Sequence, residues 1–287
     1  MRVATAEFSD GYKGPILIID DRYVDLREYG FNDVRAVLES MAVDPHEILR
    51  IGEKAYGTHE LKLVKIKAPI ERPGKLLCLG LNYLDHAREL GFEIPREPIV
   101  FAKAPTAIIG PEEPIIIPSF VKEADYEAEM AVIIGVRAKN VKAEEAYDVI
   151  AGYTAFNDVS ARDHEFRYGG QWFRGKSFDT FAPLGPYIVS KKEIRDPHSL
   201  DIELRLNGQI MQKSTTRNMI FKIPEIIEFI SQGMTLEPGD VIATGTPSGV
   251  GFRRKPPLFL KHGDVVEVFI SKIGLLRNPV IHEERIS

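Results

Sequence analysis

Three acidic side chains at every second position open the apolar run DYEAEMAVIIG, residues 125–135. Asp125, Glu127 and Glu129 would share one face of a β-strand, because successive side chains of a strand alternate between its faces. Like charges on one face repel, and carboxylates near a core are costly unless they are paired or coordinated. Two interpretations follow. The stretch is either a polar strand end that meets water, which the local pattern favours, or a ligand pair for a hard divalent cation.

A further carboxylate, Asp158, ends the run GYTAFND, where a predicted strand meets a predicted helix. Its oxygen could be a third ligand beside Glu127 and Glu129, since hard cations collect several carboxylates. Aspartate at such a junction is, however, often only a cap or turn residue. The position taken alone favours that simpler interpretation.

His86 and Glu89 lie three residues apart in the predicted short helix NYLDHARELG, so they share a helical face. A carboxylate that accepts a proton from one imidazole nitrogen orients the ring and makes the other nitrogen a better base. The spacing therefore suits an acid–base pair. It equally suits a solvated pair on a helix surface, which is the more frequent outcome.

Arg162 and Lys176 flank a loop that contains Gln171 and the only tryptophan, Trp172. Cations near an acidic site could bind an anionic substrate or balance the carboxylates, although isolated residues of this kind are usually surface charges. The later run GTPSGVG lacks the lysine of a phosphate-binding loop and does not match G-x-G-x-x-G. It predicts a tight turn that presents backbone N–H groups and Thr246, and it argues against a nucleotide or NAD site.

Composition narrows the class of protein. The chain has 287 residues, 44% of them hydrophobic, and a formal net charge of −5 with both signs interspersed, so nucleic acid is not an expected partner. The single cysteine, Cys78, lies in the apolar run LLCLGL and is predicted to pack in the core. This cysteine usage fits a reducing cytoplasm. No signal-peptide pattern or membrane-spanning apolar segment is present. We expect a soluble cytoplasmic protein.

The first 70 residues predict a small α/β domain. VATAEF, PILIID and LKLVKIKAPI are expected strands, Asn32-Asp33 would cap a helix over VRAVLESMA, and a second helix would follow Asp44-Pro45. The polar stretch ERPGK contains Pro-Gly and predicts a domain boundary. The expected domains are therefore residues 1–70 and 71–287.

The second part shows short strands between dense turn signals, with few helices. It predicts a strand-rich α+β domain with a mostly antiparallel or mixed sheet system. Asn207-Gly208 between alternating runs predicts a two-residue hairpin. Expected helices cover AEEAYDVI and PEIIEFISQG. The local helix signals are Asn82 as N-cap and Gly91 at the C-terminus of the His86 helix, a capping box over Ser160-Ala-Arg-Asp163, and Pro224 and Gly233 at the ends of the last helix.

In collinear order over residues 76–251, six blocks resemble the fumarylacetoacetate hydrolase superfamily, and most of all its domain-containing, acylpyruvase-like members. They are GLNYLDHARELG, KAPTAIIGPEEPIIIP, DYEAEMAVIIG, GYTAFNDVSARD, GKSFDTFAPLGP and GDVIATGTPSGVG. The resemblance implies a mixed β-roll of packed sheets, a small N-terminal domain and a homodimer. It also implies Mg²⁺ or Mn²⁺ as cofactor, with Ca²⁺ in some crystals.

The resemblance gives the candidate residues roles, and Asp125 is not among its metal ligands. The founding hydrolase of the family has a further upstream aspartate ligand without a counterpart here, which argues against fumarylacetoacetate as the substrate. The predicted roles are metal ligation by Glu127, Glu129 and Asp158; catalysis by His86, Glu89 and Lys176; and substrate binding by Arg162, Lys176, Gln171 and Thr246.

The implied function is that of a divalent-metal-dependent enzyme acting on 2-oxo or 1,3-dicarbonyl acids. The first hypothesis is C–C bond hydrolysis of an acylpyruvate-type substrate through a metal-bound enolate. The alternative is keto–enol tautomerisation or decarboxylation of oxaloacetate-like acids at the same site, since one site supports several reactions. A non-catalytic protein that binds a metal and a 2-oxo acid is a third possibility, but such a binder would not need both His86 and Glu89.

Overall fold

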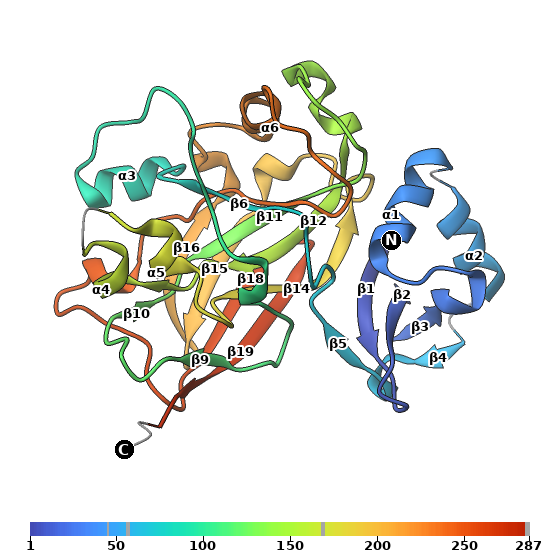
Figure 1. Ribbon diagram of the computed structural model, residues 1–287, viewed down its shortest axis with the longest axis horizontal. Helices are drawn as coiled ribbons and strands as arrows, with labels where there is room; N and C mark the ends of the chain where they lie inside the picture. Colours follow the sequence, from blue (N-terminus) through green and yellow to red (C-terminus); the bar gives the residue numbers. More distant parts are fainter. Residues whose placement is uncertain (45, 56–57, 168–169, 285–287) are drawn as a thin grey trace.

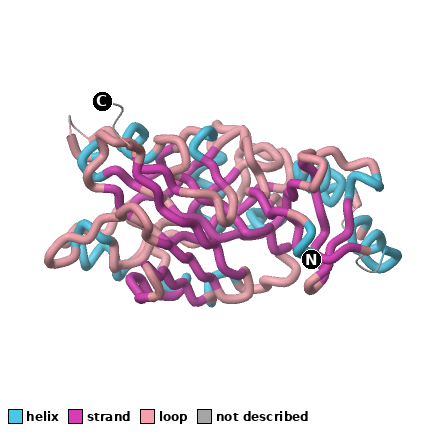
Figure 2. Tube along the Cα trace, turned by 90° about the horizontal axis from the view of Figure 1, so that it is seen from below, coloured by secondary structure: helices cyan, strands magenta, loops and turns pink. Residues whose placement is uncertain are grey.

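A computed structural model of the protein describes residues 1–44, 46–55, 58–167 and 170–284. Strands form the centre of the molecule and short helices lie around them (Figures 1 and 2). Among the described helices, none has both the length and the apolar character needed to cross a membrane.

The described residues form three sheets, and the largest has 12 strands in the order β4-β3-β2-β1-β14-β12-β11-β17-β6-β7, with β5 on β1 and β8 on β14. Its strands are β1 Arg2–Glu7, β2 Lys13–Ile19, β3 Arg22–Asp25, β4 His59–Glu60, β5 Lys65–Lys67, β6 Leu76–Gly80, β7 Ile99–Ala102, β8 Ile108–Ile109, β11 Ala128–Ile134, β12 Ile150–Asn157, β14 Ala182–Ser190 and β17 Val241–Ala243. The five-stranded sheet contains β16 Gln209–Thr215, β15 Asp201–Leu206, β18 Val265–Ile270, β19 Gly274–His282 and β9 Ile115–Ile117, and the two-stranded sheet contains β10 Ala124–Asp125 and β13 Ser160–Ala161.

Helices are short by comparison. The α-helices are α1 Val34–Val43, α2 Glu47–Ala55, α3 Leu84–Leu90, α4 Arg162–Glu165, α5 Trp172–Lys176 and α6 Ile223–Ser231. The 3₁₀ turns are η1 Leu26–Tyr29, η2 Leu61–Leu63, η3 Pro105–Ala107, η4 Ala143–Asp148, η5 Pro197–Ser199, η6 Thr216–Asn218 and η7 Gly251–Arg253. This content confirms the predicted α+β class with packed mixed sheets.

Strand β11 lies at the centre of the core and is buried along its whole length. Met130 and Val132 belong to the hydrophobic cluster that also contains β15 and β18 of the five-stranded sheet. Ala131 and Ile133 point the other way, into a cluster shared with α1, α2 and Cys78. Because both faces are covered, the strand that follows the acidic residues is held rigidly, and the core position predicted for Cys78 is confirmed.

The N-terminal part extends the large sheet, because β1 pairs with β14 as well as with β2 (Figure 1). Asp33 caps α1 by accepting the Ala36 N–H at 2.8 Å, as predicted. Of the predicted strand LKLVKIKAPI, only Lys65–Lys67 is extended after the turn η2. Pro45, expected at the start of the second helix, lies outside the described residues. The division into residues 1–70 and 71–287 stays a prediction.

Two predicted caps are wrong because their side chains bind distant segments. Helix α3 begins after Tyr83, and the Asn82 amide instead donates to the carbonyls of Phe221 and Thr244, at 3.1 and 2.8 Å. Helix α4 begins after Ala161 without a side-chain cap. Ser160 lies in β13, and its hydroxyl oxygen accepts a hydrogen bond from the Lys176 ammonium at 2.8 Å.

Signals that depend only on local geometry are confirmed. Asn207 and Gly208, both with positive φ, form the turn between β15 and β16. Gly91 ends α3 in the left-handed conformation, and Pro224 lies in the first turn of α6. The helix predicted over AEEAYDVI is the 3₁₀ turn η4.

Candidate active site

Three buried carboxylates, called here the carboxylate trio, converge where β11 begins and β12 ends. Glu127 precedes β11, Glu129 lies in it, and Asp158 follows β12. The two strands are antiparallel, and the Asp158 N–H donates to the Glu127 carbonyl at 2.9 Å. One oxygen atom from each side chain lies within 4.8 Å of the other two. A hard cation could be held by these three oxygens.

The two glutamates of the trio have pKa values shifted in opposite directions. Burial, together with the neighbouring carboxylates of Asp158 and Glu127, raises the pKa of Glu129 well above its ordinary value. Burial alone would also raise the pKa of Glu127, but Lys176 and Arg162 hold it below its ordinary value. Glu127 is therefore already paired in the absence of a metal, whereas Glu129 accepts a bond only from the Gly245 N–H, at 2.8 Å, among the hydrogen bonds of the described chain.

Two lysines contact Asp158, and only one of them was predicted. Lys176, from α5, donates to Asp158 Oδ2 at 2.8 Å and to Glu127 Oε2 at 2.9 Å. Lys103, at the end of β7, is 1% exposed and donates to Asp158 Oδ1 and, at 3.0 Å, to the carbonyl of Val159. Burial lowers the pKa of Lys103. Its signal in the sequence was a lone lysine inside the apolar run IVFAKAPTAII.

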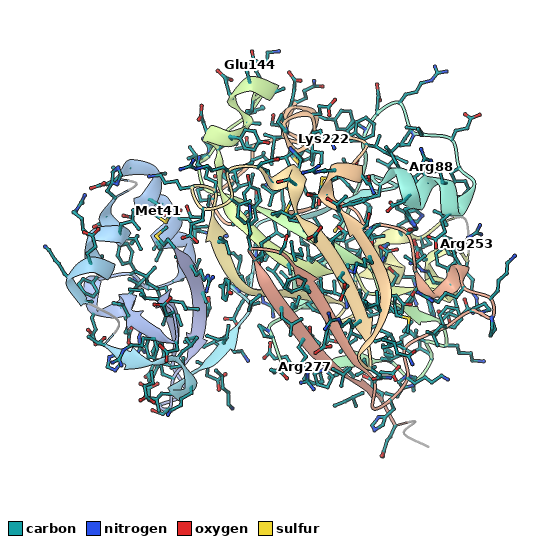
Figure 3. The ribbon with its side chains drawn as sticks, turned by 180° about the vertical axis from the view of Figure 1, so that it is seen from behind. Met41, Arg88, Glu144, Lys222, Arg253 and Arg277 are labelled. Carbon is teal, nitrogen blue, oxygen red and sulfur yellow. The ribbon has the colours of Figure 1, made fainter. Side chains whose placement is uncertain are left out.

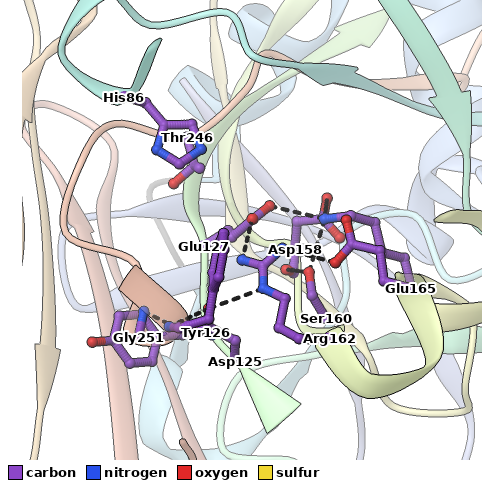
Figure 4. Close-up of polar contacts among 12 residues, drawn as sticks. His86, Asp125, Tyr126, Glu127, Asp158, Ser160, Arg162, Glu165, Thr246 and Gly251 are labelled. Atoms are coloured by element: carbon purple, nitrogen blue, oxygen red, sulfur yellow. Dashed lines mark hydrogen bonds and ion pairs between the residues drawn. The ribbon is translucent and has the colours of Figure 1, made fainter. Parts of the chain in front are cut away.

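Arg162, the first residue of α4, binds three carboxylates (Figure 4). Its guanidinium contacts Asp125 Oδ2 at 3.0 Å, Glu127 Oε1 at 2.5 Å and Glu165 Oε2 at 2.8 Å. The Phe252 ring covers it at 4.4 Å. Although burial alone would lower it, these carboxylates raise the pKa of Arg162 well above its ordinary value. The predicted substrate-binding arginine is thus fully occupied by protein carboxylates.

Charge balance favours a divalent cation at the trio. Ion pairs join seven buried charges into one cluster, and Glu129 lies close to Glu127 and Asp158 within it, so that five carboxylates face three cations. Two negative charges are left over, which equals the charge of one divalent cation. Without such an ion, a proton on Glu129 relieves part of the imbalance, in accord with its raised pKa. The members are Asp125, Glu127, Glu129, Asp158, Glu165, Lys103, Arg162 and Lys176.

His86 and Glu89, which were predicted to form an acid–base pair, are in contact. His86 Nδ1 lies 3.0 Å from Glu89 Oε2, on the same face of α3, and the imidazole is 6% exposed. The second carboxylate oxygen of Glu89 accepts the Gly249 N–H at 2.9 Å, so the orienting group is itself fixed. His86 lies beside Thr246 and above Glu127 (Figure 4). The ring lines the same cavity as Glu127 and Glu129.

A cavity of about 220 Å³ is lined by His86, Glu127 and Glu129, while Glu89 and Asp158 are not among its lining residues. Its polar residues include His86, Thr246 and Lys176, while one wall is apolar. Gln171, predicted to bind substrate, is exposed at the start of α5 and does not line the cavity, so its role stays a prediction. The apolar lining is Leu79, Leu81, Leu90, Phe92, Ile99, Phe101, Phe166, Trp172 and Phe252.

A buried carboxylate trio below a histidine–glutamate pair, at the end of central strands in a mixed β-roll, is the arrangement of a divalent-metal-dependent acid–base enzyme. The family model described as fumarylacetoacetate (FAA) hydrolase C-terminal matches residues 75–281. The chain belongs to the fumarylacetoacetate hydrolase family.

Relatives and solved structures cover most of the molecule. Oxaloacetate tautomerase fahd2, mitochondrial, of Xenopus laevis is 46% identical, over 87% of this chain and 82% of its own. The crystal structures of 5-carboxymethyl-2-hydroxymuconate delta-isomerase from Mycobacterium smegmatis and of fumarylacetoacetate hydrolase from Exiguobacterium antarcticum are 34% and 33% identical, with TM-scores of 0.78 and 0.83. Both cover 99% of this chain and 100% of their own.

The cytoplasmic location expected from the sequence is contradicted by these comparisons, because curated relatives from Xenopus laevis, Rattus norvegicus, Bos taurus and Homo sapiens are named mitochondrial proteins. The expectation relied on the cysteine content. A single buried cysteine indicates only that the chain forms no internal disulfide, and it does not identify a compartment.

Proposed function

We propose that the protein is a divalent-metal-dependent keto–enol tautomerase of oxaloacetate-like 2-oxo acids. The observation that carries the proposal is that His86, oriented by Glu89, lines the same cavity as Glu127 and Glu129 of the carboxylate trio. Metal-assisted tautomerisation uses a cation that stabilises the enolate and a group that moves one proton, and the residues of this site could supply both functions. The relative named oxaloacetate tautomerase supports the substrate class.

Glu127, Glu129 and Asp158 would hold the cation, which we propose is Mg²⁺ or Mn²⁺. When bound, the ion would polarise the 2-oxo group and stabilise negative charge on its oxygen. Glu127 would then exchange part of its pairing with Arg162 and Lys176 for ligation. The N–H groups of Arg162 and Lys176 that now bind Glu127 could then contact the carboxylate of the substrate, with Thr246 as a further hydrogen-bonding group at the cavity wall.

His86 would move the proton. Nδ1 is engaged by Glu89, so Nε2 is the nitrogen available to the substrate. Ketonisation transfers one proton from the enol hydroxyl to carbon 3, and ketone-to-enol conversion reverses it. His86 would deliver or remove the proton at carbon 3, while the Glu89 carboxylate stabilises the imidazolium form.

Hydrolysis of a C–C bond in an acylpyruvate-type acid is the second candidate. It uses the same residues, with His86 activating a water molecule toward the distal carbonyl. The likeness to a fumarylacetoacetate hydrolase structure favours it. Decarboxylation of oxaloacetate would need no activated water and is a third outcome for the same assay. We also propose a homodimer, which light scattering would test.

The test follows the loss of enol absorbance when purified protein with Mg²⁺ or Mn²⁺ meets enol-oxaloacetate, alongside cleavage of acetylpyruvate and fumarylpyruvate. We expect accelerated ketonisation that is abolished by a chelator and by His86→Asn. His46→Asn, at an exposed histidine, is the matched control. If ketonisation is no faster than in buffer that contains the metal, the tautomerase proposal is wrong. If the protein only cleaves an acylpyruvate, the hydrolase replaces the tautomerase as the proposed function.

A further inference from the structure

We propose that Asp125 is a positioning residue, which fixes the catalytic pair by holding the loop that orients Glu89. The inference rests on the proposed function, because it takes His86 and Glu89 to be the acid–base pair. Asp125 lies outside the carboxylate trio, although it precedes it by two residues. Its contacts show what it holds.

Among the described residues, the Asp125 carboxylate accepts hydrogen bonds from three backbone N–H groups and from the Arg162 side chain. Oδ1 accepts the N–H groups of Gly251, at 2.7 Å, and Tyr126, at 2.8 Å. Oδ2 accepts the Phe252 N–H at 3.1 Å and the Arg162 Nε–H at 3.0 Å. The side chain is 0% exposed. A buried carboxylate with four donors ties the backbone of residues 251–252 to the base of the site (Figure 4).

The same loop grips the helix that carries the catalytic pair. The Gly249 N–H donates to Glu89 Oε1 at 2.9 Å, and Arg253 donates to the carbonyls of Glu89 and Leu90 at 3.1 and 3.4 Å. These carbonyls lie in the last turn of α3, where a cation is favourable. Arg253 lies at the edge of the molecule that also carries α3 and Arg88 (Figure 3). Residues 249–253 thus join Asp125 to Glu89.

The fit between loop and carboxylate is close. A Cβ atom at Gly251 would lie 2.5 Å from Asp125 Oδ1 and 2.0 Å from the Leu258 carbonyl, so only glycine lets the backbone reach Asp125. Phe252, the next residue, covers the Arg162 guanidinium at 4.4 Å. Because Arg162 also grips Glu127, the position of the catalytic pair is linked to that of the trio.

Asp125→Asn tests the link with little change in volume. The amide oxygen can still accept from Gly251, but the amide nitrogen would face the donors of Phe252 and Arg162, and the loop would loosen. Asp240→Asn is the matched control, since Asp240 is also 0% exposed and accepts the N–H groups of Lys75 and Glu237, both at 2.8 Å.

A second pair of variants avoids the core. Arg253→Ala removes the exposed clamp on the carbonyls of Glu89 and Leu90 and does not disturb a buried group. Arg88→Ala is its control, because it removes an exposed arginine from the same helix, α3. If Asp125→Asn fails to fold, this pair still decides the link between the loop and the catalytic helix.

The measurements are amide hydrogen exchange of the metal-loaded protein and steady-state kinetics. We expect Asp125→Asn and Arg253→Ala to speed exchange in both residues 249–254 and residues 84–91. We expect kcat to fall, by about 10-fold or more for Asp125→Asn, while KM changes by less than about 3-fold, because a misplaced general base slows chemistry more than binding. The control variants should match the wild type.

Faster exchange confined to residues 249–254, or equal behaviour of Asp125→Asn and Asp240→Asn, would overturn the proposal. Hydrogen exchange needs no turnover. A wild-type protein inactive on every 2-oxo acid would therefore refute the proposed function, while exchange in residues 84–91 would still decide whether Asp125 holds the helix. An active wild type with unchanged kcat in both test variants would refute the positioning role alone.

Discussion

Replacing Glu129 with glutamine should separate metal binding from folding. Glu129 accepts a bond from the Gly245 N–H, and burial with two neighbouring carboxylates raises its pKa. In the metal-free protein it is therefore a neutral acid over an extended pH range, and glutamine reproduces its size and charge. We expect Glu129→Gln to change the free energy of unfolding without metal by less than about 1 kcal/mol, the scale of one altered hydrogen bond.

Metal binding should respond very differently, because Glu129 is one of the three carboxylates that we propose as ligands. We expect an affinity loss of about 100-fold or more, or about 2.8 kcal/mol. At a metal concentration 100 times the wild-type Kd, the wild type gains about 2.7 kcal/mol of stability, whereas the variant gains about 0.4 kcal/mol. These gains correspond to increases in Tm of about 5 to 11 °C and about 1 °C for a chain of roughly this size.

Glu127→Gln is the informative comparison. Glu127 already pairs with Lys176 and Arg162, so its neutralisation leaves two buried cations under-compensated. We expect the metal-free protein to lose about 3 to 5 kcal/mol of stability. Thermal unfolding of chelator-treated protein, with and without Mg²⁺ or Mn²⁺, and titration calorimetry measure both effects. If Glu129→Gln keeps the wild-type metal-induced rise in Tm, Glu129 is not a ligand.

The remaining predictions concern other charges. Lys103→Met removes a cation that contacts Asp158, so metal affinity should rise in calorimetric titration while metal-free stability falls by about 3 kcal/mol; a lower affinity would contradict the charge balance. Glu89→Gln should lower kcat by about 100-fold in the ketonisation assay with little change in KM, and an unchanged kcat would remove Glu89 from the mechanism. Burial lowers the pKa of His198, whose Nε2 accepts the Ile223 N–H, and the unfolded chain binds a proton near pH 6.5. The contribution of neutral His198 to the free energy of unfolding should therefore be fully present above that pH and be lost as the pH falls through the lower pKa of the folded state. His198→Asn should flatten this part of the pH dependence, as measured by chemical denaturation.

Local residue signals predicted those parts of the fold that neighbouring residues determine. The Asn207-Gly208 turn and the Asp33 cap need only their own backbone conformations or a side chain three residues away. The same kind of reasoning failed for Asn82 and Ser160, which have the composition of helix caps but bind groups far along the chain. A short polar side chain satisfies whichever donor or acceptor the tertiary fold brings to it, and spacing does not reveal that choice.

The residues of the charge cluster were partly predictable from the sequence, but their pairing was not. Motif resemblance identified the trio, His86 and Glu89, but it did not show that Lys103 is buried against Asp158. Nor did it show that Arg162 is occupied by three carboxylates of its own chain. Apart from the Arg162–Glu165 pair, these pairings join residues tens of positions apart, and the tertiary fold brings them together. The sequence did offer one signal, which is that Lys103 is the lone lysine of an apolar run and was therefore a candidate for burial.

Strand alternation explains both the success and the limit of the opening interpretation. Continuous β-structure would have pointed Asp125, Glu127 and Glu129 to one side. The strand is interrupted between β10 and β11, however, so alternation does not carry across Tyr126 and Glu127. The interruption lets Asp125 turn toward the Gly251 loop while the two glutamates face Asp158. Three carboxylates that would repel one another in a regular strand therefore have different neighbours, although Arg162 pairs with both Asp125 and Glu127.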